Sequence, residues 1–230
     1  MATMLSASWF GRRFAGGRLV AWCLVAGLLT GANIVLADPP PAPDAEGFIP
    51  LFDGKSLTGW EGDLKLWKVV DGAIVGDSPG IPKNQFLATT RQFENFELRL
   101  EFKLHNGRGN TGVQFRSQRD PNSTEVSGYQ ADLGETYWGC LYDEHRRNKI
   151  LVQAPPELKQ VLKPADWNSY VIRAEGAKIR LSINGMTTVD YIEPDDKIAR
   201  SGMIALQVHS GPPLKVEFRN IRIRPLGGSK

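Results

Sequence analysis

Apolar and polar side chains alternate along most of the chain after residue 47. From Phe96 to Leu104 every second residue is apolar and the residues between are charged, which is a period of two over nine residues. The same alternation returns from Ile179 to Ile183. A period of two is typical of a β-strand with one buried face. Shorter runs of the same kind predict strands over residues 66–70, 73–75, 111–117, 128–133, 169–174, 188–191, 203–209 and 215–224.

Two dipeptides between these runs predict tight hairpins. Asn184-Gly185 and Asp71-Gly72 each separate two strand candidates, and both pairs tolerate the two positive φ angles of a type I′ turn. No stretch has a convincing helical period, although Glu157–Leu162 predicts one short turn of helix. Many short strands divided by Gly, Pro and Asn turns predict an all-β fold, an antiparallel sandwich of two sheets.

The first 37 residues follow a different pattern. Arg12, Arg13 and Arg18 precede a mostly apolar stretch from Leu19 to Leu36, and Ala37 offers a small residue for cleavage. This order predicts a secretory signal peptide over residues 1–37 and an exported, periplasmic or extracellular protein. The alternative is an uncleaved membrane anchor, since the apolar run approaches spanning length. Residues 38–46, rich in Pro and Ala, then form a linker, and residues 47–228 form one domain.

The charge of the chain depends on this leader. Three of the 28 basic residues lie within it and no acidic residue does, so the mature chain has 25 basic and 25 acidic side chains. A formally neutral domain gives no general reason to expect nucleic acid as a partner, and cleavage would leave no stable membrane insertion. Cys140 is the only cysteine after the leader, which excludes an internal disulfide in the mature chain.

Alternation also predicts which side chains leave the core. If Val113 and Phe115 are buried, Asn110, Gln114 and Arg116 point to the opposite face. The same rule places Gln130 and Asp132 opposite Tyr129 and Ala131, and it places Gln207 and His209 opposite Leu206 and Val208. Amides, carboxylates and an imidazole are unusual for a plain solvated face. We therefore expect Asn110, Gln114, Arg116, Gln130, Asp132, Gln207 and His209 to form a polar cleft floor, the alternative being an ordinary exposed face.

Residues 128–148 add an unusual density of aromatic and charged side chains. Trp138 is a candidate for stacking on a sugar ring, or equally for capping the edge of the sandwich. Asp143, Glu144 and Arg146 are further candidates for binding sugar hydroxyl groups. The three histidines lack the spacing of a transition-metal site, whereas calcium bound by Asp and backbone oxygens stays open as a structural ion. No other cofactor is expected, because no phosphate-binding glycine loop is present.

In its order of motifs the chain resembles the 3-keto-disaccharide hydrolase family. Each motif alone is weak, and their order and spacing from about residue 47 to 226 carry the resemblance. The motifs are Gly47–Trp60, Trp67 before Asp71-Gly72, Phe96-Glu97-Leu98, Asn110–Arg116, Gly128-Tyr129-Gln130 with Asp132, Gly139–Asn148, Asp166-Trp167-Asn168, Asn184-Gly185, Gly202 with Leu206–His209, and Phe218–Ile221.

The resemblance implies a jelly roll of the concanavalin A-like superfamily with its ligand on the concave sheet. It also implies cleavage of glycosides whose sugar is oxidised at C3, by hydrolysis or by elimination of the C2 hydrogen followed by rehydration. For that chemistry His209 is the candidate base and Arg116 the candidate donor to the enolate oxygen, and Asp132 is a candidate acid, base or binder of sugar hydroxyl groups. Gln130 and His145 depart from the family pattern. The alternative function is a non-catalytic, lectin-like carbohydrate-binding module, since fold alone does not fix function.

Overall fold

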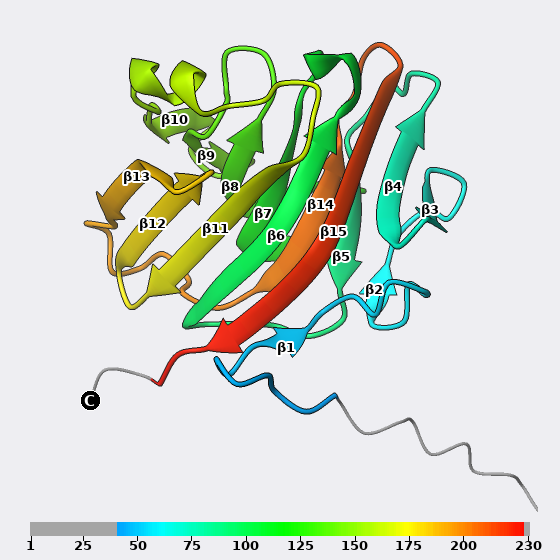
Figure 1. The fold of residues 1–230 in the computed structure, drawn as a ribbon. Coiled ribbons are helices and arrows are strands. Elements are labelled where there is room, and N and C mark those ends of the chain that lie inside the picture. The colour runs from blue at the N-terminus through cyan, green and yellow to red at the C-terminus, as the bar shows by residue number, and fades with distance from the viewer. Residues whose placement is uncertain (1–40, 228–230) are drawn as a thin grey trace, which may run out of the picture. The chain divides into compact units, whose positions relative to one another are not determined.

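A computed structural model describes residues 41–227 of the chain, which form two antiparallel β-sheets packed face to face (Figure 1). The predicted leader, residues 1–37, lies outside the described residues, as do residues 38–40 of the linker. Two short 3₁₀ helices, η1 (His105–Gly107) and η2 (Pro156–Gln160), are the helical elements of the described part. Within residues 41–227 no helix is long and apolar enough to cross a membrane.

The sheet in front in Figure 1, called the front sheet, has the strand order β13-β12-β11-β6-β15-β4-β3, and β1 pairs with β15 outside this path. Its strands are β1 (Ile49–Pro50), β3 (Trp67–Val70), β4 (Ala73–Ser78), β6 (Phe96–Leu104), β11 (Asn168–Glu175), β12 (Lys178–Ile183), β13 (Met186–Ile192) and β15 (Leu214–Pro225).

The back sheet has the order β10-β9-β8-β7-β14-β5-β2. Its strands are β2 (Trp60–Glu61), β5 (Gln85–Thr89), β7 (Thr111–Arg119), β8 (Val126–Leu133), β9 (Leu141–Glu144), β10 (Lys149–Val152) and β14 (Met203–Val208). Strands β14, β7 and β8 lie side by side at its centre although they come from distant parts of the sequence.

The core fills the space between the inner faces of the two sheets. Phe102 and Tyr170 of the front sheet pack with ring centroids 5.7 Å apart, and Phe115 stacks on Tyr129 in the back sheet at 5.6 Å. Phe96 of the front sheet meets Phe115 of the back sheet edge to face at 6.3 Å. Each such fully buried apolar side chain contributes about 1.5–3 kcal/mol, so these rings fix how the sheets pack.

Both predicted hairpins are present. Asp71 and Gly72 have φ angles of 49° and 76°, and Asn184 and Gly185 have 49° and 84°, which is the two-positive signature of a type I′ turn. They join β3 to β4 and β12 to β13. The expected helical turn near Glu157 is the 3₁₀ helix η2. The all-β prediction therefore holds, with every named strand pair antiparallel.

Candidate functional site

The outer face of the back sheet, which we call the site face, carries the polar side chains that alternation predicted. Directly paired residues of neighbouring strands share a face. Gln114 pairs with Gln130, and Gln130 pairs with Tyr142 on the next strand. Val113 and Phe115, which alternate with Gln114, belong to the core on the other side of the sheet. One row of the site face therefore runs from Gln114 across β8 to Tyr142.

Gly112 makes room on this face for the Gln130 side chain. A Cβ atom at Gly112 would lie 2.7 Å from both Cγ and Cδ of Gln130, so only glycine lets the Gln130 side chain lie over β7 at this point. Asp132 pairs with Gly112 in the register of β7 and β8 and therefore lies beside it on the site face. On β14, Gln207 is next in the pairing that continues from Ala205–Gln114 and Leu206–Val113. Gln207 and Asp132 thus face each other across Gly112, roughly 10 Å apart at two strand spacings.

A chain of hydrogen bonds orients the amides of the site face. Ser117 Oγ donates to Gln114 Oε1 at 2.8 Å, and Gln114 Nε2 donates to Gln130 Oε1 at 2.7 Å. This order leaves the Gln130 amide nitrogen free to donate toward Asp132, whose charged form it stabilises. The relay fixes the amide groups without ligand, so this part of the site face is preorganised.

Asp132 is 2% exposed, and burial raises the pKa of its carboxyl well above the ordinary value. The nearby Glu144 carboxylate raises that pKa further, while the backbone N–H of Leu133, 2.9 Å from Oδ1, and the Gln130 amide oppose the shift. Burial also raises the pKa of Glu144, with His145 and His209 acting against the shift. The site face thus holds two neighbouring carboxyl groups that keep their protons to higher pH than exposed carboxyls do.

Gln207 and His209 bring the remaining polar groups. The Gln207 side chain is fully buried, and neither Oε1 nor Nε2 has a hydrogen-bond partner among residues 41–227. Buried amides are almost always hydrogen-bonded, so this amide is placed for a bound ligand or water. His209 Nδ1 lies 2.6 Å from the Ser210 carbonyl oxygen, which can only accept, so Nδ1 carries the proton and Nε2 is left as an acceptor in the neutral ring.

Beside His209 the site face ends in a cavity of about 320 Å³. Asn110, Glu135 and Tyr137 line it together with His209. Of the predicted floor residues, Asn110, Gln114, Gln130, Asp132, Gln207 and His209 are therefore brought together, and Glu144 joins them because it pairs with Gly128 on the same face.

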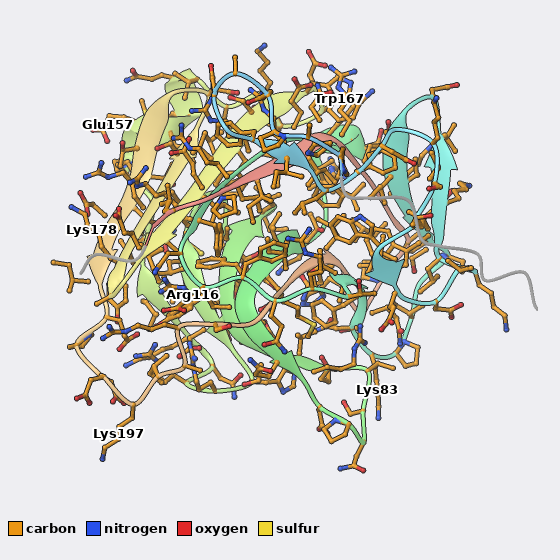
Figure 2. The ribbon with its side chains drawn as sticks, turned by 90° about the horizontal axis from the view of Figure 1, so that it is seen from below. Lys83, Arg116, Glu157, Trp167, Lys178 and Lys197 are labelled. Carbon is orange, nitrogen blue, oxygen red and sulfur yellow. The ribbon has the colours of Figure 1, made fainter. Side chains whose placement is uncertain are left out.

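The shared-face prediction is wrong for Arg116. Its φ angle of 48° forms a β-bulge, and the register of β7 and β8 shifts between Phe115 and Gln118. The guanidinium therefore turns away from Asp132. It donates to the carbonyl oxygens of Glu94 at 2.8 Å and Gly176 at 2.7 Å, and to Asn95 Oδ1 at 3.1 Å. In Figure 2 Arg116 lies in the interior, whereas Trp167, Lys178 and Lys197 lie at the periphery. The predicted role of Arg116 at an enolate oxygen does not fit this position.

Asp143 and Arg146 also lie away from the site face. Asp143 alternates with Tyr142, is fully buried, and points to the inner side of β9 with Leu141. Arg146 Nε donates to Asp143 Oδ1 at 2.7 Å and its guanidinium stacks on the Tyr129 ring at 4.4 Å. Arg147 bridges Asp143 and Glu193, and Tyr129 donates to Glu193 at 2.6 Å. These residues form a partly buried ionic network that joins the end of β9 to β8 and to Glu193 after β13, so neither Asp143 nor Arg146 is placed to bind sugar.

The network gives a stability prediction. Burial would raise the pKa of Glu193, but hydrogen bonds from Arg147 and Tyr129 outweigh it and lower the pKa to about 2. Glu193→Gln is therefore expected to reduce the free energy of unfolding at pH 7 by about 1–3 kcal/mol, measured by urea denaturation. Because the folded-state pKa is depressed from 4.5, this contribution is present above pH 4.5 and is lost as pH falls toward 2.

The matched control is Glu175→Gln, which removes an ion pair with Arg173 whose two side chains are each 36% exposed. This control should change the free energy of unfolding by less than about 0.5 kcal/mol. Equal losses in both variants, or a Glu193→Gln loss that persists at low pH, would contradict the structural role of the network.

Trp138 caps the sandwich and does not reach the site face. Its ring packs on Phe102 of the front sheet at 6.2 Å between centroids, which settles the two alternatives for this residue in favour of the edge cap. Sequence reasoning missed Tyr142 and Ser117 on the site face. Tyr142 lies on β9, whose four residues are too few for a period of two to identify its face from the sequence. Within residues 41–227 no group of three or more His, Cys, Asp or Glu side chains is arranged to hold a metal ion.

Comparisons with known proteins agree with this geometry. A family model described as the 3-keto-alpha-glucoside-1,2-lyase-like domain matches residues 47–224. A curated 3-keto-disaccharide hydrolase from Bacteroides thetaiotaomicron is 28% identical over 173 residues, a match that covers 64% of this chain and 59% of that protein. The chain thus spans about three-fifths of the length of this relative.

Three solved structures share the fold. A putative glycosyl hydrolase from Parabacteroides distasonis is similar with a TM-score of 0.62 and 24% identity, over 80% of this chain and 95% of that one. A Bacillus subtilis protein of galectin-like fold has a TM-score of 0.61 and 13% identity, and the match covers 83% of this chain and 99% of that one. The carbohydrate-binding module CBM66 of Bacillus subtilis has a TM-score of 0.56 and 17% identity, and the match covers 72% of this chain and 95% of that one. These likenesses confirm the two-sheet sandwich of the concanavalin A and galectin type.

Proposed function

The chain belongs to the 3-keto-alpha-glucoside-1,2-lyase-like domain family, and from that premise we propose that it cleaves glycosides whose sugar carries a ketone at C3. The observation that carries the proposal is the row of polar side chains at Gly112, where a buried acid, Asp132, and the unpartnered Gln207 amide flank the same residue, with His209 at the end of the same face. An acid, an amide donor and an imidazole base are the groups that an elimination next to a ketone requires.

The reaction begins with removal of the C2 hydrogen as a proton. The C3 ketone makes this hydrogen acidic, because the electron pair is delocalised onto the C3 oxygen as an enolate. When the enolate electrons return, they form the C1–C2 double bond and break the bond from C1 to the glycosidic oxygen, which takes up a proton and leaves. Addition of water, hydroxyl to C1 and hydrogen to C2, then gives the 3-keto sugar and completes a net hydrolysis.

His209 is suited to be the base that accepts the C2 hydrogen. Its Nδ1 proton is engaged by the Ser210 carbonyl oxygen, which leaves Nε2 as the acceptor, and His209 lines the cavity at the end of the site face. A positioned base of this kind contributes a rate factor of about 10²–10⁴. Asp132, whose pKa burial raises, supplies the proton for the departing oxygen.

With Arg116 turned away, the enolate oxygen needs another donor. The Gln207 side chain is the group available, because its Nε2 is buried and has no acceptor among the described residues. Gln207 and His209 are two positions apart on one face, which separates their Cα atoms by roughly 7 Å. One group can thus reach the C3 oxygen while the other reaches C2 of the same ring.

One assay tests the proposal directly. The purified protein is incubated with 3-keto-glucosides and with the unoxidised parent glucosides, and products are identified by mass spectrometry. Cleavage of the 3-keto compounds alone is the expected result. Equal cleavage of both series would replace the proposal by a carboxylate-pair glycosidase, for which Asp132 and Glu144 are the neighbouring carboxyls. Binding of sugars without cleavage would instead mark a carbohydrate-binding module.

The amino-terminal pattern supports an exported location for this activity. Three arginines, an apolar stretch and the small residue Ala37 precede the domain. We expect the mature protein to start near Asp38 outside the cytoplasm, as the amino-terminal sequence of protein purified from the native cell envelope or medium would reveal. An intact Met1 on the cytoplasmic form, with none outside, would contradict export.

A further inference from the structure

The β-bulge in β7 turns the Ser117 side chain onto the site face. Gln114 lies on that face, and strict alternation would place a residue three positions later on the other one. The extra residue at Arg116 removes one step of the alternation, and Ser117 Oγ comes within 2.8 Å of Gln114 Oε1. Two glycines make room for this: a Cβ at Gly128 would lie 2.2 Å from Ser117 Oγ, and one at Gly202 would lie 2.5 Å from the Ser117 backbone nitrogen.

Arg116 holds the bulge in this shape. Its three acceptors are the carbonyl oxygens of Glu94 and Gly176 and the side-chain oxygen of Asn95. Glu94 and Asn95 precede β6, and Gly176 follows β11, so all three belong to connections of the front sheet. The bulge is therefore fixed by contacts outside β7, and so is the direction in which Ser117 points.

Ser117 starts a chain of hydrogen bonds that has one direction. Its Oγ lies 2.8 Å from Gln114 Oε1 and 3.0 Å from the carbonyl oxygen of Phe115, which can only accept, so Ser117 is the donor. With its oxygen engaged by Ser117, the Gln114 amide turns Nε2 to Gln130 Oε1 at 2.7 Å. Gln130 therefore has its nitrogen, and not its oxygen, left for Asp132.

The register of β7 and β8 places the last step of the chain. Gly112 pairs with Asp132, and a Cβ atom at Gly112 would lie 3.0 Å from Gln130 Nε2. The Gln130 nitrogen thus lies beside Asp132 on the site face. An amide N–H in this position stabilises the carboxylate that Asp132 becomes when it gives up its proton.

Buried amides of this kind are costly for the fold. Ser117 and Gln114 have no exposed surface, and Gln130 is 2% exposed. Apolar side chains of similar size would avoid the free-energy cost of burying these polar groups. Oε1 and Nε2 of Gln114 are both engaged by protein side chains, whereas the Gln207 amide has no partner among residues 41–227. Gln114 is thus placed to orient another side chain and not to bind a ligand.

We propose that Ser117, Gln114 and Gln130 are positioning residues, which aim one amide N–H at Asp132 and so control the release of its proton. The inference rests on the proposed function, in which Asp132 gives that proton to the departing oxygen. When the proton leaves, the Gln130 N–H already points at the carboxylate, and no side chain has to turn. The order of donors along the chain is set at Ser117, which lies two amide groups away from Asp132.

Ser117→Ala tests the proposal at the far end of the chain. Without the hydroxyl group both amides are free to turn over, and Asp132 loses its assured donor. We expect kcat for a 3-keto-glycoside to fall by about 10-fold with little change in KM. The decline of kcat at high pH should also move to higher pH, because the ionised carboxylate is less stabilised. Gln130→Met, which keeps the length of the side chain but has no donor, should act in the same direction.

Ser78→Ala is the matched control. Ser78 is also buried, lies in β4 of the front sheet, and accepts one hydrogen bond, from the backbone N–H of Gly80 at 3.1 Å. This variant should keep the kcat and the pH profile of the unaltered protein. Urea unfolding checks that each variant folds. A loss of kcat in Ser117→Ala without a change in its pH dependence would mean that Ser117 acts only through stability, and would overturn the proposal.

A titration without substrate separates the relay from the reaction. Carbon nuclear magnetic resonance of protein labelled at its aspartate carboxyls follows the ionisation of Asp132, whose signal is the one missing in Asp132→Asn. The pKa of Asp132 should be higher in Ser117→Ala and Gln130→Met than in the unaltered protein, and unchanged in Ser78→Ala. If these shifts appear but no 3-keto-glycoside is cleaved, the relay stands and the proposed reaction falls. An unchanged Asp132 titration in Ser117→Ala would overturn the relay, whether or not cleavage occurs.

Discussion

Replacement of His209 by alanine is expected to lower kcat for a 3-keto-glycoside by about 10²-fold or more, since the C2 hydrogen then has no positioned base. KM should change little, because the Gln207 amide and the Asp132 carboxyl on the site face remain in place. Steady-state kinetics on the preferred 3-keto substrate measures both constants. Far-ultraviolet circular dichroism and urea unfolding check that the sandwich still forms, as the half-buried position of His209 outside the core leads us to expect.

His105→Ala is the matched control for this experiment. His105 lies in η1 and pairs with Glu217 of the front sheet, outside the site face. We expect kcat to stay within about two-fold of the unaltered protein, as for a surface substitution away from the site. A similar loss of activity in both histidine variants, or full activity in His209→Ala, would remove His209 from the mechanism.

Asp132→Asn should also lower kcat by about 10²-fold, because the amide keeps the shape of the side chain but cannot give its proton to the leaving oxygen. Burial raises the pKa of Asp132, so its acid form persists to higher pH than that of an exposed carboxyl. The kcat of the unaltered protein should therefore fall as pH rises through this raised pKa. The residual activity of Asp132→Asn should lack that fall, which a pH profile of kcat measures.

The raised pKa of Asp132 also predicts how the free energy of unfolding depends on pH, which offers an independent check. A carboxyl whose folded-state pKa is raised stabilises the fold below its unfolded pKa of about 3.8, and that contribution is lost as pH rises toward the folded value. Asp132→Asn removes this loss, so above neutral pH the variant should unfold at the same or a higher urea concentration than the unaltered protein. A large destabilisation at high pH would mean that the ionised carboxylate is needed by the fold.

Much of the fold could be predicted from the sequence because it depends on local patterns. The nine alternating residues Phe96–Leu104 became β6 with the same bounds, and the two dipeptides Asp71-Gly72 and Asn184-Gly185 became type I′ turns. Two shorter strands were not predicted: β5 (Gln85–Thr89) and β9 (Leu141–Glu144) have only five and four residues. A period of two over so few residues is not distinct from chance, and their pairing partners, not their own pattern, define them.

The site was predicted as far as the alternation of β7, β8 and β14 continues without interruption. The prediction for Arg116 failed because one residue in a left-handed conformation moves every later side chain of the strand to the other face. That bulge fits because Gly202, far along the chain, lets the two backbones approach; a Cβ there would lie 2.5 Å from the Arg116 carbonyl carbon. The prediction for Asp143 failed for a related reason, since the inner face of β9 accommodates a charge only because Arg146 and Arg147 follow it and pair with it. The positions of Arg116 and Asp143 thus depend on contacts that the local sequence pattern does not show.

The central claim is that cleavage begins at C2 and depends on the ketone at C3. The most direct test is the reaction of a 3-keto-glycoside in deuterium oxide, with the product examined by nuclear magnetic resonance and mass spectrometry. If His209 removes the C2 hydrogen and water later returns a proton to that carbon, the 3-keto sugar produced should carry deuterium at C2, or the unsaturated sugar should be found in its place. A hydrated product that retains its original hydrogen at C2 throughout turnover, measured before any exchange in free solution, would contradict the account.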